Sequence, residues 1–542
     1  MRFRGRVAAT ALLAVLALAA ALRWTSPADV ADLRPRPDAL EYEEAARSLA
    51  EGRGYRLWIG GDAYPPRYPP GMSLLLAAAT PLTGTEPGSG VRVVLLCALV
   101  AIAGTFVLAR SAGGTTAGLA AALVVAASPL HVLWSQAVMS DVPATAAVAW
   151  IACWTVAALR RRAGTTERVA LGVACGLAVC LRQPLALVAA ALCAATFLLP
   201  QSGLRDRVRR TAATAGGVLL GVAPFLWLNA SLFGSPLRSG YGYWAPRGTF
   251  ALREATGVRI GDQPSNLAKY VTLLLGDGGL YAWPAFLLLV LGTFVALRLG
   301  SGARRLCAFA WLTTVLCTGV LATYSMPTSR LLLPLLPLLA ATMSLAVAGA
   351  APAWSRRLGA ALLAGSLLLL AAADPERFGR PLAPLHDTAT LAKIAVRTEP
   401  NAVILAYTSP LLFRRVLRRD GADRVWVPLR IDEHMLTIKA RARQPIERDP
   451  ARGGWIEKAI VAGFRPAHVV ARIEELCRTG RPVYLSMQGG SRVKFLRKLK
   501  RTLQQRFGLT EVVPARPWAV HRVDCGRASP PGSTTGGGRQ TS

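Results

Sequence analysis

The chain is short of acidic side chains. Its 542 residues contain 30 aspartates and glutamates against 63 lysines and arginines, which gives a formal net charge of +33. A charge of this size often marks a nucleic-acid-binding protein. The distribution argues against that class, because many of the arginines stand in short clusters between apolar runs, as the positive-inside rule describes for membrane proteins.

Residues that commonly hold metals or nucleotides are also scarce. The five histidines show no ligand spacing, the cysteines include no C-x-x-C pair, and no glycine-rich fragment precedes Lys-Ser or Lys-Thr. The common zinc motifs and the P-loop are therefore excluded. Seven of the nine cysteines lie in apolar runs, where they act as small hydrophobic residues. Cys477 and Cys525 lie outside these runs and could pair in an oxidising compartment.

Apolar sequence is abundant instead, at 53% of all residues. It falls into repeated runs close to the length that crosses a hydrocarbon core, and helices satisfy their own backbone in lipid. We therefore expect a polytopic α-helical membrane protein. Residues 1–22 predict the first helix, although a cleaved signal peptide would show a similar pattern. With that helix, about eleven transmembrane helices are expected, the others near 91–109, 115–130, 142–159, 168–182, 184–199, 211–229, 279–298, 305–323, 331–350 and 357–373.

The segment 71–82 is too short to span comfortably, and we interpret it as a re-entrant or surface helix. With that choice, the basic clusters share one side with the N-terminal MRFRGR, and the positive-inside rule places this side in the cytoplasm. The clusters are Arg110, Arg160–Arg162, Arg168, Arg205–Arg210, Arg298, Arg304, Arg305, Arg356 and Arg357. Counting 71–82 as a full span would move all of them to the opposite side.

The pattern divides the chain into three parts. We expect a transmembrane catalytic domain over 1–373, in which 24–70 forms the first external loop. Residues 374–527 alternate β-prone and helical runs, including a helix near 410–419, which predicts an extracytoplasmic α/β domain. The Gly-, Ser- and Pro-rich tail 528–542 is expected to be disordered. The basic amphipathic run 492–507 fits a solvated helix or a helix that contacts anionic lipid headgroups.

Two acids fall on the external side beside apolar helix ends, Asp38 in the first loop and Asp141 in the sequence MSDVPAT. Taken singly, each could be a solvated loop carboxylate, and Asp141 could cap a helix that has Pro143 in its first turn. Taken together, they suggest a general base and a second carboxylate that positions substrate or binds a cation.

Three arginines stand at helix ends on the same side: Arg67, Arg182 and Arg330. Each could snorkel to the interface. Arg182 lies between two apolar runs, however, where an arginine is costly without a partner. Because guanidinium groups bind phosphate through paired hydrogen bonds, the set predicts a cationic pocket for a lipid phosphate.

Six motifs occur along the chain in a fixed order. They are D-A-x-x-Y-x-x-x-A-x-x-L-x-x-G-x-G-Y from Asp38, R-Y-P-P-G from Arg67, S-D-x-P from Ser140, L-R-Q-P from Leu181, N-x-x-x-F-G-x-P-L-x-S-G-Y from Asn229 and R-L-L-L-P-L-L-P-L from Arg330. This order resembles the GT-C membrane glycosyltransferases over about residues 30–350. The similarity is greatest to the branch that holds protein O-mannosyltransferases and the lipid A aminoarabinose transferase.

The resemblance implies a GT-C-like fold and a polyprenyl-phosphate-linked sugar donor, with transfer by inversion. It implies that Asp38 is the catalytic base, that Asp141 is the second external acid and that Arg67 is the basic residue before the Pro-Pro pair. The family's second acid directly after the first is here Ala39, with Glu41 two residues further on. Substrate contacts are expected from this arginine, from Arg182 and Arg330, and from the tyrosines inside the motifs, Tyr42, Tyr68 and Tyr241.

The sequence therefore predicts an inverting glycosyltransferase of the inner or plasma membrane. It would move a sugar from a polyprenyl-phosphate donor to a hydroxyl of an envelope protein, lipid or polysaccharide on the extracytoplasmic face, with no nucleic-acid partner. A transporter or flippase of lipid-linked sugars and a non-catalytic envelope protein are the alternatives. No metal site is assigned; Asp38 and Asp141 would be the ligands if a divalent cation were required.

Overall fold

The computed structural model describes residues 2–24, 37–59, 62–84, 89–161, 163–199, 203–244, 250–256, 265–276, 280–325, 328–372, 394, 396–406, 425–428, 466–488, 494–514 and 518–527. The chain forms two compact units. The helical unit comprises Met1–Tyr55 and Pro66–Ala383, and the sheet unit comprises Arg56–Pro65 and Pro384–Ser542.

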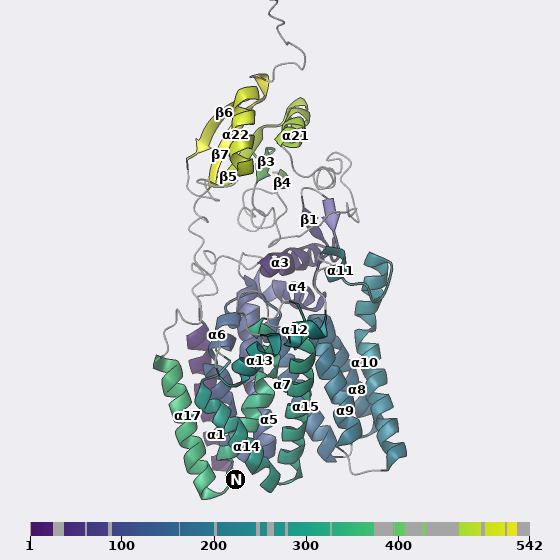
Figure 1. Cartoon of the computed structure of the whole chain (residues 1–542), viewed down its shortest axis with the longest axis vertical. Helices are drawn as coiled ribbons and strands as arrows, with labels where there is room; N and C mark the ends of the chain where they lie inside the picture. Colours follow the sequence, from purple (N-terminus) through teal and green to yellow (C-terminus); the bar gives the residue numbers. More distant parts are fainter. Residues whose placement is uncertain are drawn as a thin grey trace, which may run out of the picture. The chain divides into compact units, whose positions relative to one another are not determined.

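The helical unit is a bundle of apolar helices (Figure 1). Six helices among the described residues are long and apolar enough to cross a membrane, which fits a multi-pass membrane protein. They are α1 (Arg2–Arg23), α5 (Ser89–Ala127), α7 (Asp141–Arg161), α10 (Leu204–Phe233), α15 (Ser301–Ala322) and the continuous run of η2 (Ser329–Leu335), α16 (Leu336–Ser344) and η3 (Leu345–Val347).

The remaining predicted spans coincide with other helices of the bundle. These are α8 (Thr165–Leu181), η1 (Gln183–Leu185) with α9 (Ala186–Leu198), α14 (Trp283–Arg298) and α17 (Ala353–Ala372). The predicted spans 91–109 and 115–130 largely fall in the two halves of α5, which is kinked at Gly114 with φ 85°. The total of eleven spans therefore stays a prediction.

Glycines determine how closely α8 and α10 pack. A Cβ added at Gly172 or Gly176 of α8 would lie 2.2 or 2.3 Å from a backbone oxygen of α10. Gly217 and Gly221 of α10 face α8 at the same two distances. Small residues at this spacing let two helices approach closely, and such packing contributes to helix association in lipid.

Contacts at one end of the bundle bring predicted basic clusters together. Arg160 Nη1 donates to Ser111 O at 2.6 Å, next to Arg110 in α5, and Arg305 Nη1 donates to Leu159 O at 2.6 Å. Three clusters from distant parts of the sequence therefore share one end, as the positive-inside pattern predicts. Arg162 of the same set lies outside the described residues.

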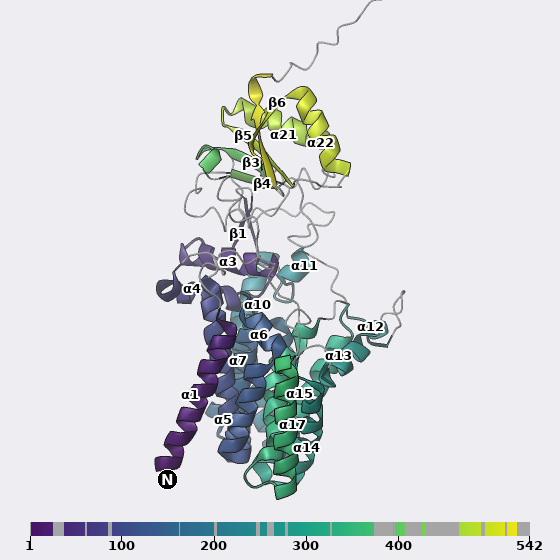
Figure 2. The same ribbon diagram turned by 90° about the vertical axis from the view of Figure 1, so that its left-hand side faces the viewer.

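Two helices lie across the opposite end of the bundle, α3 (Pro37–Ala50) and α4 (Gly71–Thr83), away from the N-terminus of α1 (Figures 1 and 2). With 13 residues, α4 is about 20 Å long, short of a hydrocarbon core of about 30 Å. This length agrees with a surface or re-entrant helix. The unit also contains α6 (Pro129–Ser135), α11 (Gly240–Trp244), α12 (Leu252–Thr256) and α13 (Asn266–Leu274).

The sheet unit contains a five-stranded sheet of order β4-β3-β5-β7-β6. The strand β3 is parallel to β4 and β5, whereas β7 is antiparallel to β5 and β6. The elements are β3 (Val403–Ala406), β4 (Val425–Pro428), α21 (Pro466–Arg478), β5 (Val483–Gln488), α22 (Lys494–Arg506), β6 (Gly508–Val513), β7 (Trp518–Asp524) and η5 (Cys525–Arg527), with a hairpin of β1 (Leu57–Ile59) and β2 (Asp62–Tyr64). The predicted helix 410–419 and tail 528–542 lie outside the described residues.

The apolar face of α22 and the residue just after this helix are buried within the sheet unit. Leu499, Leu503 and Phe507 are buried. This burial favours a solvated basic helix over one that inserts its apolar face into a membrane.

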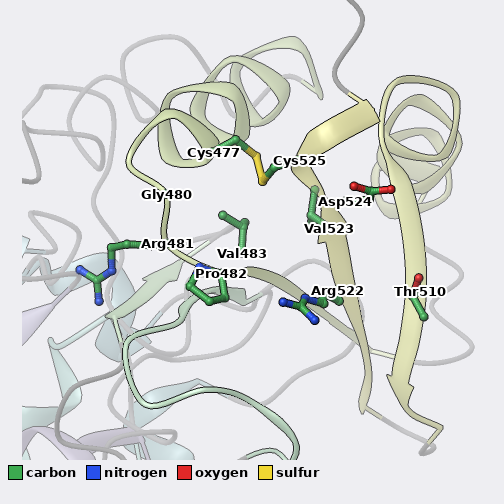
Figure 3. A pocket seen from close by; sticks show the side chains of 10 residues that line it. All are labelled: Cys477, Gly480, Arg481, Pro482, Val483, Thr510, Arg522, Val523, Asp524 and Cys525. Atoms are coloured by element: carbon green, nitrogen blue, oxygen red, sulfur yellow. A yellow bond between two sulfur atoms is a disulfide. The ribbon is translucent and has the colours of Figure 1, made fainter.

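Cys477 of α21 and Cys525 form the disulfide that the sequence allowed, with their Cα atoms 5.4 Å apart. A cavity of about 410 Å³ lies beside the disulfide, lined also by Arg481, Arg522 and Asp524 (Figure 3).

Candidate active site

The helical unit brings together acids and arginines from distant parts of the chain. Asp38 stands in the first turn of α3, Asp141 begins α7, and Arg330 lies in η2. Arg330 Nη2 donates to Asp38 Oδ2 at 3.0 Å, while its Nη1 lies 3.9 Å from Asp141 Oδ2. Arg330 therefore bridges the two acids that the sequence singled out.

Asp141 has a second arginine partner. Its side chain is fully buried, and Arg182 Nη1 lies 2.5 Å from Asp141 Oδ1. Arg182 follows the last residue of α8 in an extended conformation, and Nη1 also donates to Ser140 Oγ at 3.5 Å. An uncompensated charge in such a place costs several kcal/mol. Arg182 thus has the acidic partner that its position between apolar runs requires.

Two glycines let the Arg-Tyr-Pro-Pro-Gly segment approach this cluster. A Cβ on Gly71 would lie 2.6 Å from both Cys180 O and Leu181 Cα, directly before Arg182. A Cβ on Gly240 would lie 2.3 Å from Pro66 O. Backbone cannot yield to such contacts, so glycine at both positions is what allows the segment to pass between the end of α8 and α11.

Arg67 of that segment pairs with an acid that the sequence analysis did not assign to the site. Arg67 Nη2 lies 3.5 Å from Glu41 Oε1, and the Arg67 backbone N–H donates to Glu41 Oε2 at 3.4 Å. Glu41 is 2% exposed. The signal in the sequence was its spacing, because residues three apart share a helix face and Glu41 follows Asp38 by three on α3.

The three predicted tyrosines pack in a row. The ring centroids of Tyr42 and Tyr68 are 4.8 Å apart, and Tyr241 meets Tyr68 edge-on at 5.5 Å. The Tyr42 hydroxyl lies 3.1 Å from Ser140 Oγ, which links the row to the Arg182–Asp141 pair.

Two further residues were missed by the sequence analysis. Trp134 lies beneath the Arg330 guanidinium, 5.3 Å from it, in a cation–π contact. Ser140 connects Tyr42 to Arg182. Ser140 stands directly before Asp141 in the sequence, whereas nothing in the sequence pointed to Trp134.

The surroundings of the two acids on α3 shift their protonation in opposite directions. Burial alone would raise the pKa of Asp38. The charge of Arg330, hydrogen bonds from Tyr68 and Arg330, and the charge of Arg67 outweigh it and hold this pKa below its ordinary value. Burial raises the pKa of Glu41 to about 7, a rise that Arg67 opposes and Asp38 reinforces. Asp38 is therefore ionised at neutral pH, whereas Glu41 titrates there.

The phenols and Arg67 keep their ordinary protonation. Burial, followed by the charges of Asp38 and Glu41, raises the pKa of Tyr68, so that it stays a phenol. Burial tends to lower the pKa of Arg67, but the charge of Glu41 and other nearby groups raises it. The guanidinium thus remains charged in its buried position.

The carboxylates considered as ligands of a divalent cation are paired with arginines. Among the described residues no group of three or more His, Cys, Asp or Glu side chains is placed to hold a metal ion. The two acids proposed as ligands, Asp38 and Asp141, both have arginine partners. A bound cation would have to compete with these guanidinium groups for the same oxygens.

Comparison with known proteins gives one family and several solved structures. The family model for dolichyl-phosphate-mannose-protein mannosyltransferase matches residues 67–228, which include Arg67, Asp141 and Arg182. No curated protein matches the chain.

The structural matches extend over nearly the whole chain. ArnT from Cupriavidus metallidurans, solved with bound undecaprenyl phosphate, has a TM-score of 0.62 at 15% identity, covering 96% of this chain and 99% of that one. AglB from Archaeoglobus fulgidus, an oligosaccharyltransferase in complex with an inhibitory peptide and a dolichol-phosphate, has a TM-score of 0.56 at 12% identity, covering 96% and 74%. The arabinofuranosyltransferase AftD from Mycobacteria has a TM-score of 0.51 at 16% identity, covering 96% and 40%. The expected GT-C fold is thereby confirmed.

Proposed function

We propose that the chain is a multi-pass membrane glycosyltransferase that moves a sugar from a polyprenyl-phosphate donor to a hydroxyl group with inversion. The single observation that carries this proposal is the Arg330 bridge between Asp38 and Asp141. It places two acids and a guanidinium, a group that binds phosphate, in one place on a fold shared with ArnT, AglB and AftD.

Arg67, Arg182 and Arg330 are the proposed contacts of the donor phosphate. All three belong to one cluster with the acids, and a guanidinium matches the geometry of a phosphate. Two fold relatives were solved with a bound polyprenyl-type phosphate, undecaprenyl phosphate in ArnT and dolichol-phosphate in AglB. These points support a lipid phosphate as the charged part of the substrate.

Asp38 is the proposed general base. It is ionised at neutral pH, and its side chain is 20% exposed, so an acceptor hydroxyl can approach it. Glu41 has the higher pKa but is 2% exposed and faces Arg67. Access therefore favours Asp38, and a carboxylate base typically contributes about 10²–10⁴-fold.

The reaction that follows is a single displacement. The acceptor oxygen attacks the anomeric carbon from the face opposite the phosphate, and its proton passes to Asp38. The bond from that carbon to the phosphate oxygen breaks, and polyprenyl phosphate leaves with the bonding electrons. Arginines stabilise the charge that develops on the leaving oxygens, an effect that is strong where water is partly excluded. No step is assigned to a cation.

The orientation of the chain is part of the proposal. We propose about eleven transmembrane helices in the inner or plasma membrane, with the catalytic face and an α/β domain over residues 374–527 on the extracytoplasmic side. The acceptor is an envelope protein, lipid or polysaccharide. The shared end of three basic clusters, which would be cytoplasmic, supports this orientation.

The test follows the chemical fate of the donor. Purified protein in proteoliposomes would be given polyprenyl-phosphate sugars that carry a label on the sugar, together with an envelope extract. A transferase releases free polyprenyl phosphate and places the label on an acceptor, and this result is expected. A flippase would move the labelled lipid intact to the other leaflet. A non-catalytic protein would leave the labelled lipid unchanged. Either outcome would refute the proposal.

A further inference from the structure

Glu41 is buried, lies one helical turn from the proposed base, and has no part in the reaction as described so far. It contacts Arg67 twice, through the guanidinium at 3.5 Å and through the backbone N–H at 3.4 Å. A carboxyl that holds both the backbone and the side chain of one arginine restricts where that arginine can point.

The contact between the two side chains is loose. Its 3.5 Å separation exceeds the 2.7–2.9 Å or so of a strong charge-assisted hydrogen bond. The Nε and Nη2 atoms of Arg67 are buried and make no hydrogen bond within the described part of the chain. Two donors on a buried cation are thus still available to another acceptor.

We propose that Glu41 is a positioning residue for the donor phosphate, which holds Arg67 in place in the empty site and yields its guanidinium to the phosphate on binding. This inference rests on the proposed function, because it assumes that Arg67 receives a phosphate. The phosphate brings the negative charge that Glu41 otherwise supplies. Once Arg67 turns to the phosphate, a buried carboxylate would be left beside a second anion, and Glu41 takes up one proton from solvent instead.

The surroundings of Glu41 agree with this exchange. Burial already brings its pKa to about 7, so little further change is needed for protonation. The charged groups that act on it are Arg67 and Asp38, and the phenols coupled to it are Tyr55 and Tyr68. Of these, only Arg67 stabilises the ionised form. Drawing Arg67 away therefore moves the pKa of Glu41 upward.

The exchange predicts that donor binding is linked to protons. If phosphate binding raises the pKa of Glu41 by one unit from about 7, affinity at pH 6 exceeds that at pH 8 by roughly fivefold. A phosphate monoester titrates in this range too. The informative quantity is therefore the difference between the wild type and Glu41→Gln, which keeps the side-chain shape and cannot ionise.

The experiment is calorimetric titration of full-length protein in nanodiscs with undecaprenyl phosphate, in two buffers that differ in ionisation enthalpy. The wild type should take up a fraction of a proton more than Glu41→Gln near pH 7 and show the steeper gain in affinity toward pH 6. Glu41→Asp should restore part of the uptake. Glu51→Gln, which removes an exposed carboxyl just after α3, should match the wild type.

Two results would overturn the inference. One is equal proton uptake and an equal pH slope in the wild type and Glu41→Gln. The other result concerns Arg67→Gln, which replaces Glu41→Gln in the test if that variant does not fold. Without Arg67, the buried Glu41 is already protonated before the phosphate binds. Full wild-type proton uptake by Arg67→Gln would therefore contradict the exchange. A wild type that does not bind undecaprenyl phosphate at any pH would instead refute the proposed function.

Discussion

The guanidinium of Arg182 lies 2.5 Å from the carboxylate of Asp141, and both side chains are almost completely buried. Asp141 begins α7 and Arg182 directly follows α8, so the pair joins the ends of two helices. A pair of this kind contributes little net stability compared with apolar packing, but removing one partner leaves a charge with no compensation. The pair therefore fixes the position of Asp141 beside Arg330.

Breaking this pair should destabilise the protein strongly. Arg182→Leu is expected to cost about 3–5 kcal/mol, because it leaves the Asp141 carboxylate buried without its nearest cation. The thermal unfolding midpoint of the purified protein measures the effect. Arg161→Leu is the matched control, since its pair with Glu167 is exposed and such pairs contribute at most about 1 kcal/mol. Equal shifts in the two variants would contradict the assignment.

Gly71→Ala should reduce turnover while the helices persist. The added Cβ would lie 2.6 Å from Leu181 Cα, so the end of α8 or the start of α4 has to move, and Arg182 moves with it. A displacement of about 1 Å near reacting groups can cost about 10²-fold. Gly164→Ala is the control, because a Cβ there meets no atom within 4 Å. Sugar transfer rates that fall equally in both variants, or in neither, would argue against close packing at Gly71.

Glu41 should make stability depend on pH. Its pKa in the folded protein, about 7, exceeds the ordinary value of 4.5. Glu41 therefore contributes on the order of 3 kcal/mol to the free energy of unfolding below pH 4.5. This contribution is lost as the pH rises through 7.

Thermal unfolding from pH 5 to pH 8.5 measures this effect. The midpoint of the wild type should fall relative to that of Glu41→Gln as the pH increases. A constant difference between the two curves would mean that Glu41 does not titrate in this range.

Loss of the disulfide should loosen the sheet unit alone. The residues Cys477 and Cys525 are 48 positions apart, and closing a loop of that size stabilises a fold by about 4 kcal/mol in the chain-entropy estimate. Limited proteolysis of Cys477→Ser should cleave residues 466–527 faster, with the helical unit unaffected. Cys97→Ser, which removes a thiol from α5, should behave like the wild type. If alkylation without reductant labels both cysteines of the pair, the bond is absent.

Much of the helical unit could be predicted from the sequence because lipid imposes a strong rule. An apolar run of sufficient length has to be a helix, and basic residues report which ends share a side. The two halves of α5 illustrate this rule. Arg110 and Ser111 interrupt the apolar run between the predicted spans 91–109 and 115–130, and the helix is kinked close by, at Gly114 with φ 85°.

Residues of the candidate site could be predicted from the sequence only where a charged side chain stands in an unusual place. A carboxylate or an arginine beside an apolar run is unusual enough to be noticed, as Asp38, Asp141, Arg182 and Arg330 were. Which of these side chains contact one another could not be predicted in this way. Nothing local shows that Arg67 would meet Glu41, or that Arg330 would lie over Trp134, because both contacts join residues from different segments.

The most direct measurement is the rate of sugar transfer from a labelled polyprenyl-phosphate donor by the wild type, Asp38→Asn and Asp206→Asn. The Asp206 carboxylate pairs with arginines at the start of α10, outside the site, so Asp206→Asn serves as the matched control. We predict that Asp38→Asn loses at least about 10²-fold in turnover and still binds undecaprenyl phosphate, while Asp206→Asn keeps the wild-type rate. Wild-type transfer by Asp38→Asn would contradict the assignment of the base, and with it the active site placed between Asp38, Asp141 and Arg330.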